Sequence, residues 1–192
     1  GINGVPWDAV ELPSQFMENF CWEKEALDLF AKDFETGDTI NKDLFKKMTK
    51  ARSFHAAIQM VRQLEFAIFD FRLHLEFASK NKHNIQKLLD DVRENVSVVK
   101  TPEFNRFQHS FSHIFAGGYS AGYYSYKWAE VLSADAFSKF EEQGIFNKLT
   151  GNEFLKSILE KGGSCEPMDM FIEFRGRKPS IEPLLKHAGI AV

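Results

Sequence analysis

A histidine, a pair of glycines and all four tyrosines of the chain lie in one stretch, HIFAGGYSAGYYSY, at residues 113–126. Two glycines let a backbone approach a bound chain closely, because no side chain stands in the way. A phenol donates a hydrogen bond to a developing oxyanion without being charged at neutral pH. The pattern indicates a loop that grips a ligand and can take part in its reaction.

Three segments of the chain resemble one protein family: VELPSQFMENFCWE (10–23), FSHIFAGGYSAGYYSYKWAEVLSADAF (111–137) and FRGRKPSIEPLLKHAGI (174–190). They are similar to the C-terminal part of the zinc oligopeptidases, which include thimet oligopeptidase, neurolysin, oligopeptidase A and bacterial dipeptidyl carboxypeptidase. The bacterial oligopeptidase A branch is nearest. The resemblance covers essentially the whole chain. It implies a mainly α fold, the multi-helix C-terminal portion of a zincin-type oligopeptidase catalytic domain.

The resemblance implies that Glu11 is a zinc ligand. In that family a helix with H-E-x-x-H supplies two zinc ligands and the general base, and the glutamate of V-E-x-P-S-Q completes the site. Zinc in such a site keeps one position open and activates water. On spacing alone, an ordinary exposed glutamate favoured by the dipole of a following helix is the better interpretation of Glu11, and the resemblance reverses this preference. Gln15, one turn further on, either orients a ligand or packs.

The resemblance also implies roles for the loop. Tyr126 and His113 match catalytic residues that stabilise the oxyanion and hold the substrate carbonyl. Gly117, Gly118 and Tyr119 match the mobile loop that closes over a bound peptide. Without the resemblance, any one of these tyrosines could be a half-buried helix residue. For Tyr123 and Tyr124 we expect no more than this packing role. A phosphate-binding loop is not favoured, since no G-K-[ST] follows and no basic residue lies within it.

None of the six histidines is followed by glutamate, so the chain lacks H-E-x-x-H. We therefore expect residues 1–192 to be a single helical domain, a fragment of a larger catalytic domain whose H-E-x-x-H helix lies upstream. Its partners would be short peptide substrates and the N-terminal remainder of the enzyme, and alone it would be inactive. The alternative is a non-catalytic helical module that binds peptides or other partners without cutting them.

Two further clusters allow more than one interpretation. His109 and His113 have the spacing at which two imidazoles on a helix can share a metal, although no glutamate follows the first. Arg175, Arg177 and Lys178 are basic residues that could bind the carboxylate of a peptide, but solvated surface charge or packing of the C-terminal segment is favoured.

Helices must position these residues. Apolar spacing predicts helices over residues 8–33, 41–50, 55–79, 84–96, 103–111, 123–143, 150–161, 166–174 and 179–187. Gly144 and the pair after residue 161 are predicted to end two of them. The segment 55–79 is ambiguous because apolar residues alternate over 69–77, as in a strand. The longer run of three- and four-residue steps, without Gly or Pro, favours a helix.

Composition narrows the function. The net charge of −3 gives no basic surplus for nucleic-acid binding. No apolar run approaches the ~20 residues that span a membrane. Cys21 and Cys165 are most simply reduced thiols of a cytoplasmic protein, with one disulfide as the alternative. Twenty phenylalanines, several of them in 64–77, indicate an aromatic core between packed helices.

Overall fold

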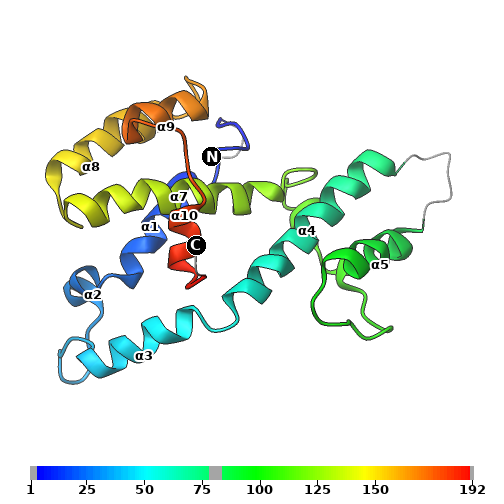
Figure 1. Cartoon of the computed structure of the whole chain (residues 1–192), viewed down its shortest axis with the longest axis horizontal. Helices are drawn as coiled ribbons and strands as arrows, with labels where there is room; N and C mark the ends of the chain where they lie inside the picture. Colours follow the sequence, from blue (N-terminus) through cyan, green and yellow to red (C-terminus); the bar gives the residue numbers. More distant parts are fainter. Residues whose placement is uncertain (1–3, 78–83, 191–192) are drawn as a thin grey trace. The chain divides into compact units, whose positions relative to one another are not determined.

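The computed structural model describes residues 4–77 and 84–190. These residues form ten α-helices and no β-strand, with one isolated antiparallel bridge between Lys32 and Thr39 (Figure 1). The predicted mainly α fold is therefore confirmed. None of the described helices is long and apolar enough to cross a membrane. The chain divides into two compact units, Gly1–Ala56 with Trp128–Val192 (unit 1) and Ala57–Lys127 (unit 2).

Unit 1 has an aromatic core. Its elements are α1 (Leu12–Asn19), a 3-10 turn (Phe20–Trp22), α2 (Lys24–Phe30), α3 (Lys42–Arg52), most of α7 (Tyr124–Gln143), α8 (Lys148–Phe154), a π turn (Leu155–Leu159), α9 (Pro167–Arg175) and α10 (Glu182–His187). Phe16 of α1 stacks on Phe154 of α8, with ring centroids 3.9 Å apart. Phe137 and Phe140 of α7 and Phe174 of α9 close the same core. The aromatic core expected from composition is confirmed here.

The single helix predicted over residues 8–33 is wrong. The chain forms α1, tightens into the 3-10 turn and becomes extended at Glu23, with φ −99° and ψ 124°. Phe20 thereby reaches the core rings of Phe16 and Phe137, while Leu29 and Phe30 of α2 stay exposed. Two short helices kept the apolar spacing of one long helix, so the periodicity alone did not show the break.

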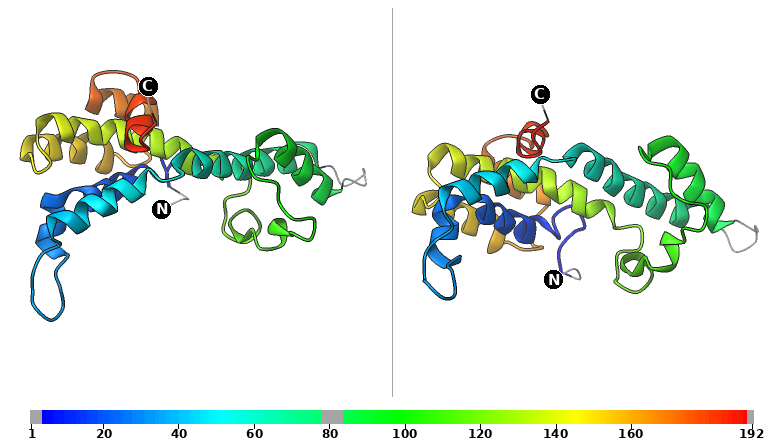
Figure 2. Two further views of the ribbon diagram at one scale, coloured as in Figure 1. Left: turned by 60° about the horizontal axis from the view of Figure 1, so that its bottom comes forward. Right: turned by 90° about the horizontal axis from the view of Figure 1, so that it is seen from below.

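Unit 2 is built on α4 (Ala56–Glu76), the long helix whose assignment the sequence left ambiguous. The helical interpretation is confirmed for residues 56–76, and positions 78 and 79 of the predicted range lie outside the described residues. The unit also contains α5 (Ile85–Val96), a 3-10 turn (Phe107–His109), α6 (Ser112–Phe115) and the first turn of α7. In all the ribbon views α5 lies beside α4 (Figures 1 and 2). Phe69, Leu73 and Leu89 form the buried centre of this unit.

Polar side chains also hold unit 2 together. Glu65 of α4 is completely buried and accepts hydrogen bonds from Arg62 (3.0 Å) and Arg93 (2.9 Å). Arg93 also donates to the side chain of Asn105 (2.9 Å), whose carbonyl oxygen accepts the N–H of Phe107. This side-chain acceptor takes the place of helical hydrogen bonds, so the helix predicted over 103–111 is wrong and only a 3-10 turn forms.

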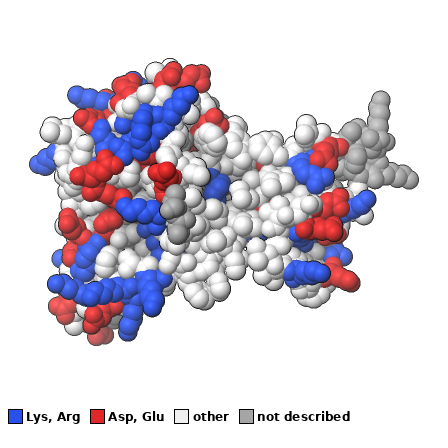
Figure 3. All heavy atoms as spheres, viewed as in Figure 1, with Lys and Arg blue, Asp and Glu red and all other residues white. Residues whose placement is uncertain are grey.

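Asparagines and glycines set several helix ends. Asn41, Asn84 and Asn147 accept backbone N–H groups at the starts of α3, α5 and α8, which begin close to the predicted positions. Gly144 follows α7 with φ 110°, as predicted. On the face drawn in Figure 3, basic and acidic residues are intermixed over unit 1, which agrees with the small net charge.

Candidate active site

The glycine–tyrosine loop (residues 113–126) lies in unit 2 and runs from α6 into the first turn of α7. The N–H of Gly117 donates to Ser112 O (2.7 Å), and that of Tyr119 donates to His113 O (3.0 Å). A Cβ added to Gly117 would lie 2.9 Å from the main chain of His113, and Gly118 has φ 84°. The turn itself therefore needs both glycines. Both are also exposed, so their backbone faces solvent.

The predicted aromatic residues of the loop form one cluster. Tyr119 and Tyr126 stack, with ring centroids 5.0 Å apart and planes 19° from parallel. The ring of His113 lies edge-on to both, at 6.3 Å from Tyr119 and 6.1 Å from Tyr126. The structure thus brings together, within unit 2, every loop residue that the sequence nominated. Phenol and imidazole groups side by side can donate hydrogen bonds to one oxygen atom.

A buried carboxylate that the sequence did not nominate holds the end of this loop. Asp70 of α4 is completely buried, and its oxygens accept the backbone N–H groups of Ala121 and Tyr123, both at 2.9 Å. His74 Nδ1 lies 2.9 Å from Asp70 Oδ1. The hydroxyl of Tyr123 donates to Gln63, also on α4 (2.9 Å). Tyr123 thus packs against α4, whereas the sequence predicted only a half-buried helix residue there.

Glu11 belongs to unit 1, where it immediately precedes α1. Pro13 in the first turn of α1 fits there because that turn's N–H groups have no helical acceptor. Ser14 Oγ donates to Glu11 Oε2 (2.8 Å), which orients the carboxylate. One turn further on, Gln15 Oε1 is buried and accepts no hydrogen bond from the described part of the chain. Such an oxygen suits an N–H donor from outside these residues.

The described residues do not form a complete metal site. They contain no group of three His, Cys, Asp or Glu side chains placed to hold a metal ion. His109 lies in a 3-10 turn and His113 in α6, with Ser110 and Phe111 outside both helices. The helical pairing of these two histidines is therefore wrong. Within the described residues Glu11 could contribute one carboxylate ligand to zinc, fewer than the three protein ligands of a catalytic zinc site.

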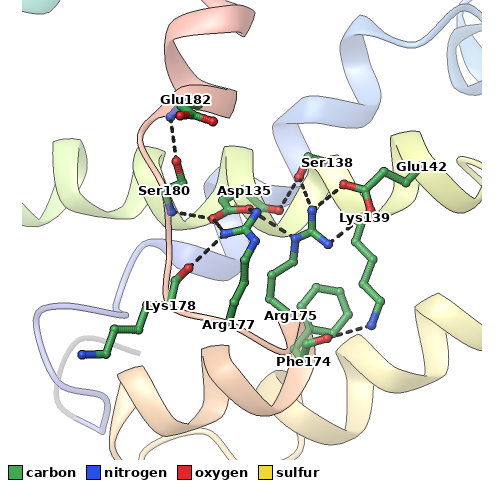
Figure 4. A network of polar contacts seen from close by, with 10 residues as sticks. All are labelled: Asp135, Ser138, Lys139, Glu142, Phe174, Arg175, Arg177, Lys178, Ser180 and Glu182. Atoms are coloured by element: carbon green, nitrogen blue, oxygen red, sulfur yellow. Dashed lines mark hydrogen bonds and ion pairs between the residues drawn. The ribbon is translucent and has the colours of Figure 1, made fainter.

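The basic cluster at residues 175–178 is engaged in a network of unit 1 (Figure 4). Asp135 of α7 is completely buried, and Arg177 contacts both of its oxygens at 2.6 Å. Arg175 (3.2 Å) and the N–H of Ser180 (2.7 Å) also donate to it. Burial raises the pKa of Asp135, but hydrogen bonds from Arg177 and Ser180 outweigh this and hold the pKa below its usual value.

The same arginines line an open groove of about 1120 Å³ in unit 1. Glu141, Glu142 and Lys186 contribute charges of both signs to its walls. Glu141 accepts a hydrogen bond from His187 (3.0 Å), which lowers the pKa of Glu141. Since Arg175 pairs with Asp135 and Glu142, the network favours the packing interpretation of the basic cluster over peptide binding.

The sequence is similar to those of known peptidases. The model of peptidase family M3 matches residues 1–190. Oligopeptidase A of Escherichia coli (strain K12) is 58% identical over 190 residues, which is 99% of this chain and 28% of that protein. Organellar oligopeptidase A, chloroplastic/mitochondrial, of Arabidopsis thaliana is 50% identical over 99% of this chain and 24% of its own length. Dipeptidyl carboxypeptidase of E. coli (strain K12) is 32% identical over 98% of this chain and 28% of its own length. The chain spans about a quarter of the length of these relatives.

Proposed function

This chain belongs to peptidase family M3, and from that premise we propose that it is the C-terminal part of the catalytic domain of a zinc oligopeptidase. The complete enzyme would hydrolyse peptide bonds in short peptides. This chain would supply one zinc ligand, the oxyanion-stabilising residues and the substrate loop. Its partners would be short peptides and the N-terminal remainder of the enzyme, in the cytoplasm, without nucleic acid or membrane.

The cluster of Tyr119, Tyr126 and His113 carries this proposal. In the proposed reaction Tyr126 donates its phenol hydrogen to the oxygen of the attacked carbonyl, and His113 supplies a second donor. The stacking of Tyr119 on Tyr126 limits the side-chain rotamers open to Tyr126 and so supports a defined position for its hydroxyl. Removing one such donor lowers transition-state stabilisation by about 3 kcal/mol.

Glu11 would hold zinc together with ligands from the rest of the enzyme. Zinc bound there supplies Lewis acidity and an activated water. The hydrogen bond from Ser14 fixes one oxygen of the Glu11 carboxylate. The buried Oε1 of Gln15 is placed one turn away to accept an N–H group from a neighbouring ligand. With one carboxylate and no H-E-x-x-H, the chain alone would hold no zinc and cut no peptide.

A chimera tests this proposal. The 190-residue segment of E. coli oligopeptidase A that aligns with this chain is replaced by this chain, and hydrolysis of a quenched fluorescent peptide is measured. The chimera should be active, and Tyr126→Phe should lower kcat by about 100-fold or more. Tyr124→Phe is the matched control, because it removes a phenol hydroxyl from outside the cluster and should leave kcat within about threefold.

Circular dichroism melting establishes that each chimera is folded before its rate is compared. A folded chimera without hydrolysis would contradict the proposal. A folded chimera that binds the peptide without cutting it would instead support the non-catalytic binding module. Equal rates for Tyr126→Phe and Tyr124→Phe would remove Tyr126 from the mechanism.

A further inference from the structure

We propose that Asp70 is a positioning residue that fixes the C-terminal end of the glycine–tyrosine loop and thereby sets Tyr126, an inference that rests on the proposed function. Asp70 is not itself a member of the loop's aromatic cluster. It acts through the backbone of the residues on either side of Gly122, at the point where the loop becomes α7.

Asp70 holds the residues just before α7 from a distant segment of the chain. Its two oxygens accept the N–H groups of Ala121 and Tyr123, which precede the first turn of α7. Amide groups of a loop have no helical acceptors, so a buried carboxylate satisfies them, and its charge near the N-terminus of α7 is favoured by the helix dipole. Because each oxygen takes a different N–H group, the carboxylate fixes both position and orientation of the backbone.

The loop backbone is strained at the point that Asp70 holds. Ala121 has φ 55°, in the left-handed region that residues with a Cβ rarely adopt. Such a conformation persists where surrounding contacts over-determine it, and these conformations cluster at functional sites. The hydrogen bond from the Ala121 N–H to Asp70 is one such contact.

A second contact from α4 supports the same point. Gln63 accepts the hydroxyl of Tyr123, and Gln63 and Asp70 lie two turns apart on one face of α4. Between them, the ring of Phe66 packs edge-on against Tyr123 at 5.9 Å. Tyr126 follows one turn later, and its N–H donates to Tyr123 O (3.3 Å). The rigid helix α4 therefore sets the start of α7 and, through it, the phenol of Tyr126.

The chain offers a matched control for this proposal. Glu65 lies on the same helix and is equally buried, but it binds Arg62 and Arg93 rather than the loop. Asp70→Asn and Glu65→Gln each replace a buried carboxylate by its amide. Only Asp70→Asn should release the loop.

Hydrogen exchange by NMR on the 192-residue chain is the first test. Asp70→Asn should raise exchange of the Ala121 and Tyr123 amides by about 10-fold or more, while the α5 amides of Leu89 and Val92 keep their rates. Glu65→Gln should leave the two loop amides protected. Unchanged exchange at Ala121 and Tyr123, or an equal rise throughout unit 2, would overturn the proposal that Asp70 holds the loop.

Steady-state kinetics on the chimera is the second test. Asp70→Asn should lower kcat by about 100-fold with KM changed less than threefold, because a misplaced phenol weakens mainly the transition state. Glu65→Gln should lower kcat far less. A released loop with unchanged kcat would overturn the positioning role. An inactive parent chimera would refute the proposed function, whereas the exchange rates would still decide whether Asp70 holds the loop.

Discussion

Asp70 of unit 2 and Asp135 of unit 1 are both completely buried carboxylates, and they have opposite surroundings. Asp135 is neutralised by Arg175 and Arg177 and accepts one backbone N–H group. Asp70 accepts two backbone N–H groups and lies beside His74. Asp135, whose partners are arginines, links α7 to the end of α9 and to the segment that follows it. Asp70, whose partners are backbone amides, fixes the position of a loop.

The backbones beside the two carboxylates differ as well. Gly176, between the two arginines that contact Asp135, has φ 79° at no steric penalty. Ala121, which donates to Asp70, has φ 55° and a Cβ. The backbone beside Asp135 is therefore unstrained at its positive-φ residue, whereas the backbone that donates to Asp70 is strained. We infer that the first arrangement serves stability and the second serves position.

The largest expected effect comes from removing Asp135. Asp135→Ala leaves two arginines without their buried counter-charge and should lower the free energy of unfolding by about 3 kcal/mol. Urea denaturation measures this, and Glu142→Ala, at the exposed edge of the same network, should lower it by less than about 1 kcal/mol. In the folded chimera, Asp135→Ala should leave kcat unchanged. A kcat as low as that of Asp70→Asn would break the contrast between the two carboxylates.

The pH dependence of stability sharpens the same contrast. The pKa of Asp135 is lowered on folding from an unfolded value of about 3.9, so its stabilisation is complete above that value and is lost as pH falls through the folded pKa. Thermal melts from pH 6 to pH 2 should therefore show a decline below about pH 4 that is shallower in Asp135→Asn. Glu141, whose pKa His187 also lowers, leaves a residual slope. Identical slopes would contradict the assignment.

Substitutions at Gly176 and Ala121, the positive-φ residues beside the two carboxylates, should change the free energy of unfolding by different amounts. Gly176→Ala should lower the free energy of unfolding by about 1 kcal/mol, since a Cβ there meets no atom within 4 Å and only the backbone conformation opposes it. Ala121→Gly should change it by less than about 0.5 kcal/mol, because the relieved strain offsets the greater entropy of the unfolded chain. Differential scanning calorimetry measures both. A large loss for Ala121→Gly would show that Ala121 is not strained.

The smallest expected effect is that of His74→Ala. His74 contacts one oxygen of Asp70 from a partly exposed position, so its removal should raise exchange of the Ala121 amide by less than about threefold. The same NMR experiment as for Asp70→Asn measures it. An effect as large as that of Asp70→Asn would mean that the imidazole, rather than the carboxylate alone, holds the loop.

Local patterns predicted much of the fold. The family resemblance is confirmed, as are the helix over α4, the helix starts near residues 41 and 84 and the glycine end of α7. The break at Glu23 was missed because α1 and α2 keep one apolar spacing across it. The turn at 103–111 was missed because Asn105 takes a partner from α5, and helix propensity carries no information on such contacts.

The candidate site was predicted only where its residues are neighbours in sequence. His113, Tyr119 and Tyr126 come from one stretch, and they do form one cluster. Asp70 lies more than 50 positions from its amide partners, so no local spacing links them. An acidic residue between Phe69 and Phe71 was the available signal, since a carboxylate within an apolar run must find a partner. The catalytic, substrate-binding and metal roles of these residues and of Glu11 remain predictions.

The zinc content of two proteins tests the central claim most directly. The 192-residue chain and the chimera are dialysed against zinc-containing buffer, then against buffer alone, and analysed by mass spectrometry of the metal. We predict a value near zero for the chain, near one for the chimera, and near zero again for the chimera with Glu11→Gln. A value near one for the isolated chain, or for the Glu11→Gln chimera, would contradict a zinc site that this chain completes with Glu11.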